Sequence, residues 1–359
     1  MRVAVAHEWL VRYAGSERCV EEMLAAFPGA LLVTTVIDPA AVPPVLRDAE
    51  PSFLQRVPGT RRHHEWFLPL MPLAWRLADL PSGLDAVISS SHACAKGVRA
   101  EEGVPHLCYC YTPMRYAWDF PAEHRRFPAP LRPAARLGMA WFRAWDRRTA
   151  ERVDRFVAIS RAVADRIRRF YGRTAEVIYP PVNTEFFTPG GERSDEFLYV
   201  GRLVSYKRAD LVVQAFDGLP HQLLVVGDGH LAERLRATAP ANVRFLQGVD
   251  DAGLRDLYRS ARALIYPAEE DFGIVMAEAQ ACGTPVVSLA AGGALDIVQP
   301  GESGWLLEGQ SVEELRRAVE RAATEELDSA EIRGSAERFS RERFQRELRA
   351  TVEELVGHP

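Results

Sequence analysis

Short apolar runs alternate with amphipathic stretches along the first half of the chain. An apolar run without polar alternation predicts a strand buried on both faces, and helical patterns between such strands indicate parallel, right-handed βαβ units. The predicted strands are Val3–Ala6, Ala30–Val36, Ala86–Ser89, His106–Tyr109 and Arg155–Ile159. Helical patterns at Glu17–Phe27 and Ala134–Glu151 lie between them. The first half therefore predicts an α/β domain with a parallel sheet.

The same alternation restarts in the second half. The predicted strands are Phe197–Val200, Gln222–Val226, Val243–Leu246, Ala263–Tyr266 and Pro285–Ser288. The helical segments between them are Arg208–Phe216, Leu231–Thr238, Asp251–Arg259 and Ile274–Cys282. We therefore predict two doubly wound, Rossmann-like α/β domains that face each other across a cleft. Ligands of such sheets bind at the carboxyl ends of the strands.

The break between the two series is rich in proline and glycine. Pro180-Pro181 and Pro189-Gly190-Gly191 suit a linker better than the interior of an element. We expect an N-terminal, acceptor-side domain over residues 1–182 and a nucleotide-sugar-binding domain over residues 183–338. We expect the last segment, 339–359, to form a helix that crosses back to the N-terminal domain.

The composition is that of a soluble globular protein, with 359 residues of which 47% are hydrophobic and 26% charged. No apolar run reaches the length of about eighteen residues that a membrane-spanning helix requires. The N-terminal apolar run is too short for a secretory signal. We expect a cytoplasmic protein in which Cys19, Cys94, Cys108, Cys110 and Cys282 are buried, reduced thiols.

The net charge of −5 conceals two halves of opposite sign. Residues 1–180 hold 25 Lys and Arg against 19 Asp and Glu, and the remainder holds 19 against 30. The basic half has no motif for nucleic acid, so we expect no nucleic-acid partner. An anionic membrane surface or a phosphorylated acceptor is the more consistent partner for it.

The segment Glu269–Ala279 carries the strongest chemical signal. It follows a predicted strand and opens a helix, where free backbone N–H groups and the helix dipole favour an anion. Gly273 lets a ligand approach the backbone closely. Glu278, about one turn into the helix, can hold a ribose diol, and Glu270 can reach the hydroxyls of a sugar. Stabilisation of the helix dipole explains the acidic residues Glu269–Asp271 equally well, but it does not explain Glu278.

Two other loops carry weaker signals. In Gly201–Arg208, which follows a strand, Arg202 and Lys207 can clamp a diphosphate, although a solvated basic loop is an equally good explanation of this segment alone. Gly15 opens a helix after the first strand. It can let the first domain approach the phosphates, but a simple turn is the commoner reason for such a glycine.

Together these motifs resemble the family 4 retaining glycosyltransferases of GT-B fold. The resemblance extends over nearly the whole chain and rests on Gly201-Arg202…Lys207, on Glu270-x7-Glu278 and on Pro180-Pro181-Val182-Asn183…Phe187. Further matches are Val226-Gly227-Asp228-Gly229, Gly283-Thr284-Pro285-Val286-Val287 and Gly292-Gly293. In the first half, His7-Glu8-Trp9-Leu10 and the segment 109–118 are similar to a branch rich in bacterial mannosyltransferases of polysaccharide and O-antigen assembly. Tyr111 stands where that branch often carries a histidine.

The resemblance implies roles for individual residues. Arg202 and Lys207 would bind the donor diphosphate, and Glu278 the ribose. The transferred sugar and its phosphate would be bound by Glu270 and by the backbone of Gly273, Ile274 and Val275. Val249 and Asp251 correspond to the loop that contacts the base. His92, which would otherwise be read as a structural histidine after a strand, would contact the sugar and support transfer.

The sequence contains no Asp-x-Asp motif, the usual metal-diphosphate holder of the other large transferase fold. We therefore expect no metal, because Arg202 and Lys207 can neutralise the departing diphosphate. The acidic triplet Glu269–Asp271 is the alternative, as a Mg²⁺ site. The resemblance implies retention, with the leaving phosphate taking the acceptor proton on the same face.

The sequence carries weaker signals for the acceptor-binding region. Basic residues at Arg56, Arg61, Arg62, His63 and His64 precede the aromatic and apolar run 66–75, a combination typical of a membrane-surface segment. We expect segment 56–75 to contact the inner face of the membrane. The run Trp141–Arg148 has a similar composition, but core packing explains it at least as well.

These features predict a cytoplasmic, metal-independent, retaining glycosyltransferase without a cofactor. It would move a hexose, with mannose favoured, to a glycan or lipid-linked acceptor. The donor would be GDP-mannose, or failing that a UDP-sugar. The alternatives are a sugar-nucleotide epimerase or phosphorylase on the same fold, and a non-catalytic subunit of a polysaccharide assembly complex.

Overall fold

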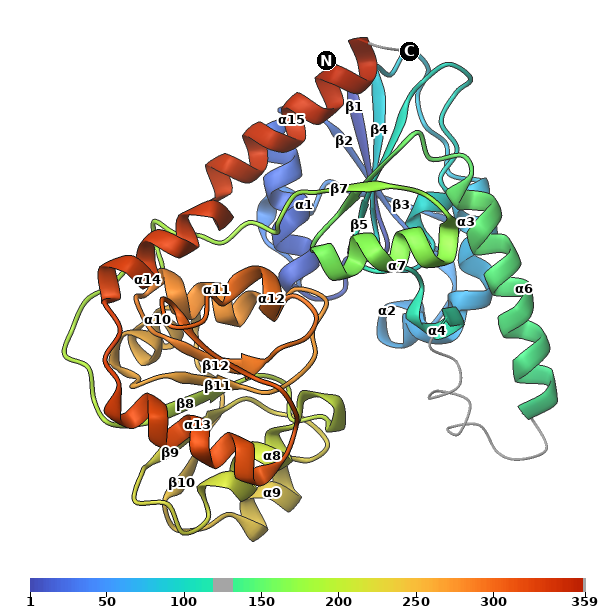
Figure 1. Ribbon diagram of the computed structural model, residues 1–359. Coiled ribbons are helices and arrows are strands. Elements are labelled where there is room, and N and C mark those ends of the chain that lie inside the picture. Colours follow the sequence, from blue (N-terminus) through green and yellow to red (C-terminus); the bar gives the residue numbers. More distant parts are fainter. Residues whose placement is uncertain (119–131, 358–359) are drawn as a thin grey trace. The chain divides into compact units, whose positions relative to one another are not determined.

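The computed structural model describes residues 1–118 and 132–357. The chain forms two compact units, one made of Met1–Pro181 with Phe344–Pro359 and the other of Val182–Arg343 (Figure 1). Each unit contains a parallel sheet with helices packed against it. The predicted fold class, two Rossmann-like α/β domains, is confirmed.

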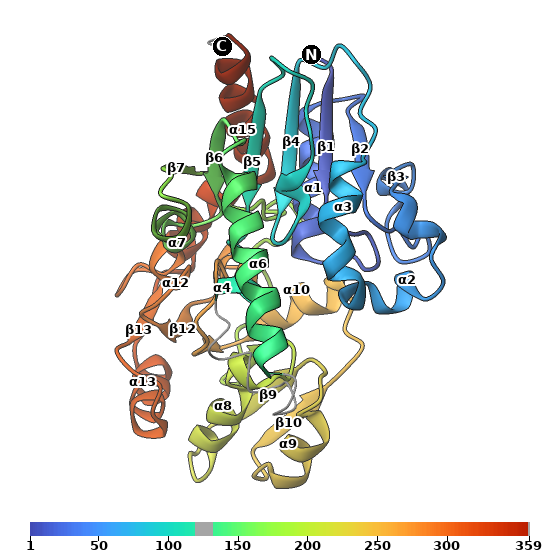
Figure 2. The ribbon, with the colours of Figure 1, turned by 90° about the vertical axis from the view of Figure 1, so that its right-hand side faces the viewer.

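The first unit is built on a seven-stranded sheet in the order β3-β2-β1-β4-β5-β6-β7, which Figure 2 shows edge to edge. Its strands are β1 (Val3–His7), β2 (Leu31–Thr34), β3 (Glu50–Pro51), β4 (Ala86–Ser91), β5 (His106–Cys110), β6 (Arg155–Ala158) and β7 (Ala175–Val177). Its α-helices are α1 (Gly15–Ala26), α2 (Thr60–His63), α3 (Met71–Arg76), α4 (Arg115–Trp118), α6 (Arg132–Ala150) and α7 (Arg161–Tyr171). Short 3-10 helices are η1 (Pro44–Leu46), η2 (Phe53–Arg56), η3 (His64–Leu70) and η4 (Ala95–Gly97).

The second unit is built on a six-stranded sheet in the order β10-β9-β8-β11-β12-β13. Its strands are β8 (Phe197–Val200), β9 (Leu223–Val226), β10 (Val243–Leu246), β11 (Leu264–Tyr266), β12 (Val286–Leu289) and β13 (Gly304–Leu307). Its helices are η7 (Ser205–Lys207), α8 (Ala209–Phe216), α9 (Ala232–Thr238), α10 (Asp251–Ser260), α11 (Ile274–Ala281), α12 (Ala294–Ile297), α13 (Val312–Thr324), α14 (Ser329–Ala336) and η8 (Glu337–Phe339).

Both sheets reverse their winding direction beside their first strand. In the first unit the chain runs outward from β1 to β3 and then returns to place β4 on the other side of β1. In the second unit β11 returns to the free side of β8 in the same way. Such a reversal leaves the loops at the carboxyl ends of the two central strands splayed apart, and ligands of doubly wound sheets bind there.

Every predicted strand is present, with ends shifted by no more than two residues. Three strands have no counterpart in the prediction: β3, β7 and β13. Each lies at an edge of its sheet. The side chains of β3 and β7 are exposed or partly exposed, so these strands lack the continuous apolar run from which the buried strands were predicted. Strand β13 was missed although it is apolar and mostly buried.

Helix α15 (Arg341–Gly357) closes the chain, and its residues from Phe344 onward belong to the first unit. The ring of Phe344 meets the ring of Tyr109 edge-on, with centroids 5.5 Å apart. Arg349 donates hydrogen bonds to the carbonyl oxygen of Ala26, at the end of α1. The last helix is therefore part of the packing of the N-terminal sheet.

The cysteines match the expectation for buried, unbonded thiols. All five are free and buried. Burial also raises the pKa of Cys19 to about 12. They therefore contribute as small apolar side chains.

The segment predicted to contact the membrane forms α2, η3 and α3. Met71 and Trp75 of this segment are buried in the core of the first unit, while Trp66 and Leu77 are exposed. In the two described ranges no helix combines the length and the hydropathy that crossing a bilayer requires.

Candidate functional site

The strongest contact between predicted site residues joins Lys207 and Glu270. Lys207 ends the loop that follows β8, and Glu270 lies in the loop that follows β11, the adjacent strand. Lys207 Nζ lies 2.7 Å from Glu270 Oε1, and both side chains are largely but not fully buried. The two motifs that were separate in the sequence therefore meet at the winding reversal of the second sheet.

Tyr266 completes this contact and was missed in the sequence analysis. Its hydroxyl donates to Glu270 Oε1 at 2.9 Å and accepts from Lys207 Nζ at 2.6 Å. Burial is the main cause that raises its pKa, so the hydroxyl stays protonated. The available signal was its position as the last residue of the strand before the acidic loop.

Glycines fix the backbone of both loops by close approach. A Cβ on Gly227, after β9, would lie 2.0 Å from the carbonyl oxygen of Gly201. A Cβ on Gly292 or Gly293, after β12, would lie 2.2 Å from the carbonyl oxygens of Glu270 and Phe272 respectively. Side chains at these positions would displace the loops that carry Lys207 and Glu270. The structure thus gives a packing reason for the additional glycine matches.

Arg202 lies in the same loop as Lys207 but is exposed. Its Nη2 donates to the hydroxyl of Tyr206 at 2.7 Å. Among the described residues, Arg202 makes no direct contact with Lys207 or Glu270. The guanidinium is accessible to an anion, but the structure does not bring it onto the pair.

Gly273 precedes α11 with a φ of +90°, and Ile274 is the first residue of that helix. The first N–H groups of a helix have no intrahelical acceptor and can bind an anion. Gly273, Ile274 and Val275 are each partly exposed. The predicted phosphate-binding backbone is therefore present and accessible on the second unit.

Glu278 lies on the same helix but is only 3% exposed. Its Oε2 accepts from the hydroxyl of Tyr258, on α10, at 3.1 Å. The carboxylate therefore lies on the buried face of α11. With so little exposed area, Glu278 can present only an edge of its carboxylate to a ligand unless the helix moves.

Val249 and Asp251 follow β10, the outer strand of the sheet. Val249 is partly exposed, and Asp251 is the exposed first residue of α10. The cap of that helix is Asp250, whose Oδ1 accepts from the N–H of Gly253 at 2.8 Å. These residues lie at the carboxyl ends of the strands, but β9 and β8 separate β10 from β11.

In the first unit, Gly15 begins α1, which follows β1, and His92 directly follows β4. A Cβ on Gly15 would meet no atom within 4 Å, so nothing in the described protein requires a glycine there. His92 is partly buried against Trp9, with ring centroids 4.8 Å apart. Burial lowers the pKa of His92, which keeps its ring neutral near pH 7.

A chain of polar side chains lies beside His92. His7 Nδ1 lies 3.0 Å from Ser90 Oγ, which lies 2.9 Å from the hydroxyl of Tyr111. His7 Nε2 also lies 3.4 Å from Glu17. Burial, the largest single influence, raises the pKa of Glu17, but the contacts with His7, its own backbone and Ser16 together lower it to about 2. Through its hydrogen bond with Ser90, Tyr111 is part of this buried polar network.

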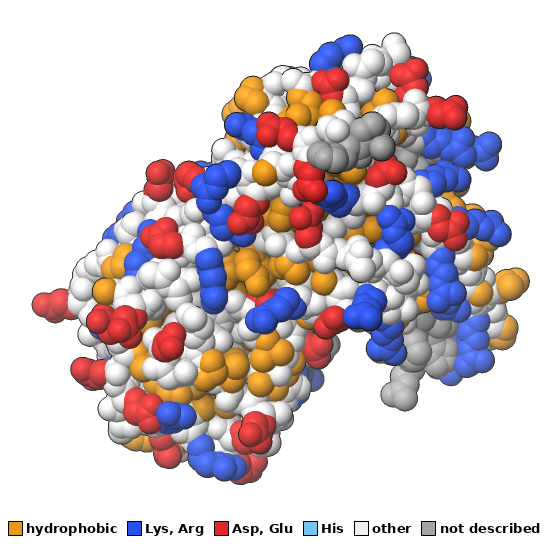
Figure 3. Space-filling model, turned by 45° about the horizontal axis from the view of Figure 1, so that its top comes forward, with side chains coloured by type: hydrophobic (Ala, Val, Ile, Leu, Met, Phe, Trp, Pro, Cys, Tyr) orange, Lys and Arg blue, Asp and Glu red, His pale blue; other side chains and the backbone are white. Residues whose placement is uncertain are grey.

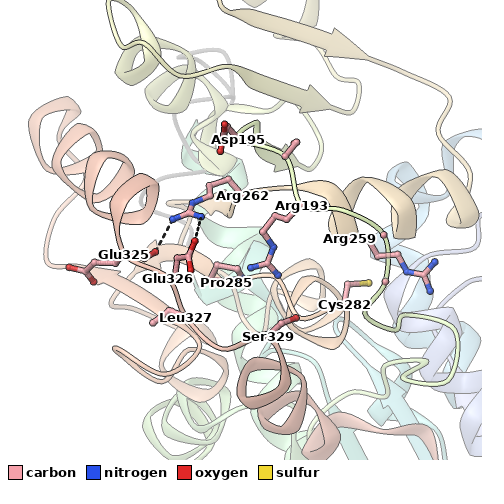
Figure 4. A pocket seen from close by; sticks show the side chains of 13 residues that line it. Arg193, Asp195, Arg259, Arg262, Cys282, Pro285, Glu325, Glu326, Leu327 and Ser329 are labelled. Atoms are coloured by element: carbon pink, nitrogen blue, oxygen red, sulfur yellow. Dashed lines mark hydrogen bonds and ion pairs between the residues drawn. The ribbon is translucent and has the colours of Figure 1, made fainter.

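A pocket of about 440 Å³ in the second unit lies at the amino ends of β8, β11 and β12, opposite the carboxyl ends that carry Lys207 and Glu270. Figure 4 shows Arg193 and Arg262 on its wall. Arg193 donates to the carbonyl oxygen of Gly283. Arg262 donates to the carbonyl oxygens of Ala322 and Ala323, in the last turn of α13, and of Glu325, just after it. No predicted site residue lines this pocket, so we place the candidate site at the carboxyl ends instead.

The described residues contain no group of three or more His, Cys, Asp or Glu side chains that could hold a metal ion. The acidic triplet Glu269–Asp271 does not form such a group. Glu270 is instead held by Lys207 and Tyr266.

Two family models match the chain. Residues 13–186 match the model described as Glycosyltransferase Family 4, and residues 184–342 match the model described as Glycosyl transferases group 1. The first match includes Gly15 and His92, and the second includes Arg202, Lys207, Glu270 and Glu278. Together the two matches leave only short terminal segments uncovered.

Curated relatives carry glycosyltransferase names. A D-inositol 3-phosphate glycosyltransferase of Kribbella flavida is 30% identical over 230 residues, which are 55% of this chain and 53% of that protein. The protein of the same name from Mycobacterium bovis is 33% identical over 170 residues, or 40% and 35% of the two chains. The chain thus spans about half the length of such relatives or less. They do not confirm the resemblance to mannosyltransferases.

Solved structures share the fold. Sucrose-phosphate synthase from Thermosynechococcus elongatus has a TM-score of 0.75 and 21% identity over 100% of both chains. Anabaena HepE in complex with UDP has a TM-score of 0.72 and 16% identity, over 99% of this chain and 100% of that one. At these identities the likeness concerns the fold alone. The two family matches, which together cover residues 13–342, show that the chain belongs to the glycosyltransferases of the family 4 and group 1 type, and its fold is the GT-B fold of these solved structures.

Proposed function

We propose that the protein transfers a sugar from a nucleoside diphosphate sugar to a glycan or lipid-linked acceptor. The observation that carries this proposal is the contact of Lys207 with Glu270 at the winding reversal of the second sheet. A cation, a carboxylate and a helix start at one sheet edge suit a ligand that has both phosphates and hydroxyls.

In the proposed reaction, Lys207 and Arg202 neutralise the diphosphate as it departs, with the N–H groups at the start of α11 as further donors. Glu270 binds hydroxyls of the transferred sugar and Glu278 binds the ribose. His92 supports transfer from the first unit. Because Lys207 and Arg202 supply two positive charges from one loop, we propose that no metal is needed. We also propose retention, with the leaving phosphate accepting the proton of the acceptor hydroxyl.

The base and the sugar are separate proposals. GDP-mannose is supported by the N-terminal motifs His7–Leu10 and 109–118 alone. A UDP-sugar is supported by the fold neighbour HepE, whose solved complexes contain UDP and UDP-glucose. Val249 and Asp251, at the end of β10, are the residues we expect to discriminate between the bases.

A panel of GDP, UDP, dTDP and ADP in a thermal-shift assay tests the donor site. A nucleotide at a hundred times its dissociation constant stabilises the protein by about 2.7 kcal/mol. We expect a shift with one of them that Lys207→Ala removes. No shift with any of the four would contradict the donor site. With the matching nucleotide sugar, free sugar without epimer would exclude an epimerase, and loss of turnover in Glu270→Ala would exclude a non-catalytic subunit.

We further propose that the first unit meets an anionic membrane surface. Trp66, Leu70, Leu73 and Leu77 are exposed by 77%, 43%, 45% and 62%. Leu70, Leu73 and Leu77 recur at the spacing of one face of an α-helix along α3, and Trp66 precedes them in η3. Arg62 and Arg76 are exposed in the same segment. Apolar side chains flanked by arginines suit the headgroup region of an anionic bilayer.

Helix α6 adds a second exposed stripe. Leu137 and Trp141 are 75% and 52% exposed, with Arg148 exposed on the same helix. Helices α3 and α6 pack against the same core cluster, through Trp75 and Phe142 among others. Figure 3 shows basic side chains gathered on this side of the first unit, with apolar ones among them. The two stripes thus belong to one side of the unit.

Vesicle flotation tests the membrane proposal. We expect binding to vesicles with phosphatidylglycerol but not to pure phosphatidylcholine. Trp66→Ser with Leu77→Ser should weaken binding at least about tenfold, since each side chain contributes about 1.5–3 kcal/mol when buried. Leu295→Ser, at an exposed leucine of the second unit, is the matched control. Equal binding to both vesicles would contradict the proposal.

A further inference from the structure

Glu8 is a carboxylate with no exposed surface, placed directly after β1. Four donors converge on its Oε1. They are Ser91 Oγ at 3.0 Å and the N–H groups of His92 at 3.2 Å, Ala93 at 2.7 Å and Ala95 at 2.8 Å. All four belong to the turn that joins β4 to η4. A single oxygen atom therefore holds the whole turn.

This arrangement follows from the register of the sheet. His7 of β1 is paired with Ser90 of β4, so Glu8, which follows β1, comes level with Ser91, the last residue of β4. The backbone N–H groups of His92, Ala93 and Ala95 donate to this side chain and not to a strand carbonyl. Glu8, one residue beyond the paired position, supplies the acceptor. An uncharged side chain without an acceptor would leave these groups unsatisfied.

The carboxylate is retained at a cost. Among the described residues, Oε2 of Glu8 has no hydrogen-bond partner although it is buried. Burying a charged group with one oxygen unpaired is unfavourable relative to an apolar side chain of the same size. A structural filler would not need this charge. The cost is explained if the turn must be held in one conformation.

The turn carries the side chain of His92. The ring lies edge-on against Trp9, with centroids 4.8 Å apart, and is 6.4 Å from His7 and 6.2 Å from Tyr111. Neither ring nitrogen has a hydrogen-bond partner in the parts of the chain that the structure describes. The backbone of His92 is thus fixed by Glu8 and its ring is walled by the neighbours of Glu8, while its nitrogens remain available to a ligand.

We propose that Glu8 is a positioning residue that holds His92 in the orientation required for sugar transfer. The inference rests on the proposed function, in which His92 supports transfer. It also assigns a task to the motif His7-Glu8-Trp9: His7 and Trp9 flank the imidazole, and Glu8 fixes the backbone that carries it. Glu8 itself touches no substrate, because it is fully buried.

A double-mutant cycle tests the proposal. The measurement is release of nucleoside diphosphate from GDP-mannose and from UDP-glucose by the full chain, with folded protein quantified for each variant. We expect Glu8→Ala to lower kcat about tenfold to a hundredfold, as lost hydrogen bonds to a charged group would, with the donor KM nearly unchanged. Glu8→Gln, which keeps one acceptor oxygen, should recover part of the loss.

The pair with His92→Ala separates positioning from stability. If Glu8 acts through His92, Glu8→Ala should add no further loss of kcat in the His92→Ala protein. Multiplicative losses would overturn the proposal, and so would a lower Tm without a loss of kcat. Glu22→Gln is the matched control, because Glu22 is also a buried carboxylate, bonded to Gln345. It should lower stability without changing kcat.

A second measurement keeps the proposal testable if no donor is turned over, in which case the proposed function fails but Glu8 can still be judged. Amide hydrogen exchange should accelerate at His92, Ala93 and Ala95 in Glu8→Ala and not in Glu22→Gln. The histidine ring resonance identified by its absence in His92→Ala should shift in Glu8→Ala. Unchanged exchange and an unchanged ring resonance would overturn the positioning role.

Discussion

Lys207 Nζ lies 2.7 Å from Glu270 Oε1, although the two residues come from loops after different strands. Tyr266 bonds to both, so the three side chains form a closed polar group at the sheet edge. Without a nucleotide, the Glu270 carboxylate is paired with Lys207, the cation that we propose binds the diphosphate. An arriving diphosphate must therefore take over a lysine that is already paired.

This competition predicts opposite effects for the two partners. Lys207→Met should weaken binding of the selected nucleoside diphosphate by about tenfold to a hundredfold, the value of a charge-assisted hydrogen bond. Glu270→Gln should leave that affinity unchanged or raise it, because it frees Lys207. The same variant should lower turnover of the nucleotide sugar, since it weakens the contact with the sugar. Titration calorimetry and product release measure the two effects.

A surface pair supplies the control. Arg244 and Glu196 lie 2.7 Å apart on the same unit, where Arg244 is well exposed. An exposed ion pair contributes about 0–1 kcal/mol to stability. Neither Arg244 nor Glu196 belongs to the candidate site. Arg244→Met and Glu196→Gln should change neither affinity nor turnover. If Glu270→Gln weakened the nucleoside diphosphate as strongly as Lys207→Met does, the competition would be disproved.

The glycines that touch the Glu270 loop give a second prediction. Gly293→Ala would place a Cβ 2.2 Å from the carbonyl oxygen of Phe272, and that atom is backbone. The loop must move, so we expect a loss of about 1–3 kcal/mol in unfolding free energy and weaker nucleotide binding. Urea unfolding and calorimetry check both. Gly334→Ala, in α14 with nothing within 4 Å, should be neutral or stabilising by up to about 1 kcal/mol.

The interior of both sheets was predictable because burial on two faces leaves an apolar run in the sequence. Strand β8, which is fully buried, was predicted to the residue. Strand β10 was also predicted to the residue, although it lies at the edge of its sheet and is partly exposed. The edge strands β3 and β7 were not, because their side chains are partly exposed and their sequences resemble loops. Pairing with a neighbour, rather than composition, makes these residues strands.

The candidate site was predictable to the level of its loops. Glu270 and Lys207 were found by their residue type and their position after strands, but their contact depends on the strand order, which spacing does not determine. Tyr266 and Glu8 were overlooked as candidates for a physical reason. A tyrosine that ends a strand and a glutamate that follows one look the same in sequence whether or not other loops converge on them.

A buried ion pair in the first unit carries the third prediction. Lys96 and Asp146 are 2% and 0% exposed and bonded to each other, and Trp118 and Tyr171 each donate to Asp146 Oδ2 at 2.7 Å. Lys96→Met leaves the carboxylate buried without its cation, which costs about 3–5 kcal/mol. Urea unfolding should show this loss.

The control for this pair removes both charges. Lys96→Met with Asp146→Leu should recover a large part of the lost stability, because no buried charge remains, although the donors of Trp118 and Tyr171 lose their acceptor. A double variant as unstable as the sum of both single variants would show that packing, not charge, dominates at this site.

His106 gives the last prediction, a loss of stability in mild acid. The residue is 3% exposed in β5, with Nε2 2.8 Å from Ser89 Oγ, and burial lowers its pKa from 6.5 to about 4. The unfolded chain therefore binds a proton between pH 6.5 and pH 4 that the folded protein excludes, so the neutral ring stabilises the fold above pH 6.5. This stability, at most about 3 kcal/mol, is lost as the pH falls through that window. The Glu17 carboxylate affects stability only at lower pH, between 4.5 and about 2, because folding lowers its pKa from 4.5 to about 2. Urea unfolding of the protein and of His106→Gln at pH 7 and pH 5 checks the assignment. The variant should be less stable than the parent at pH 7 but should lose less stability on acidification, and equal losses in both proteins would contradict it.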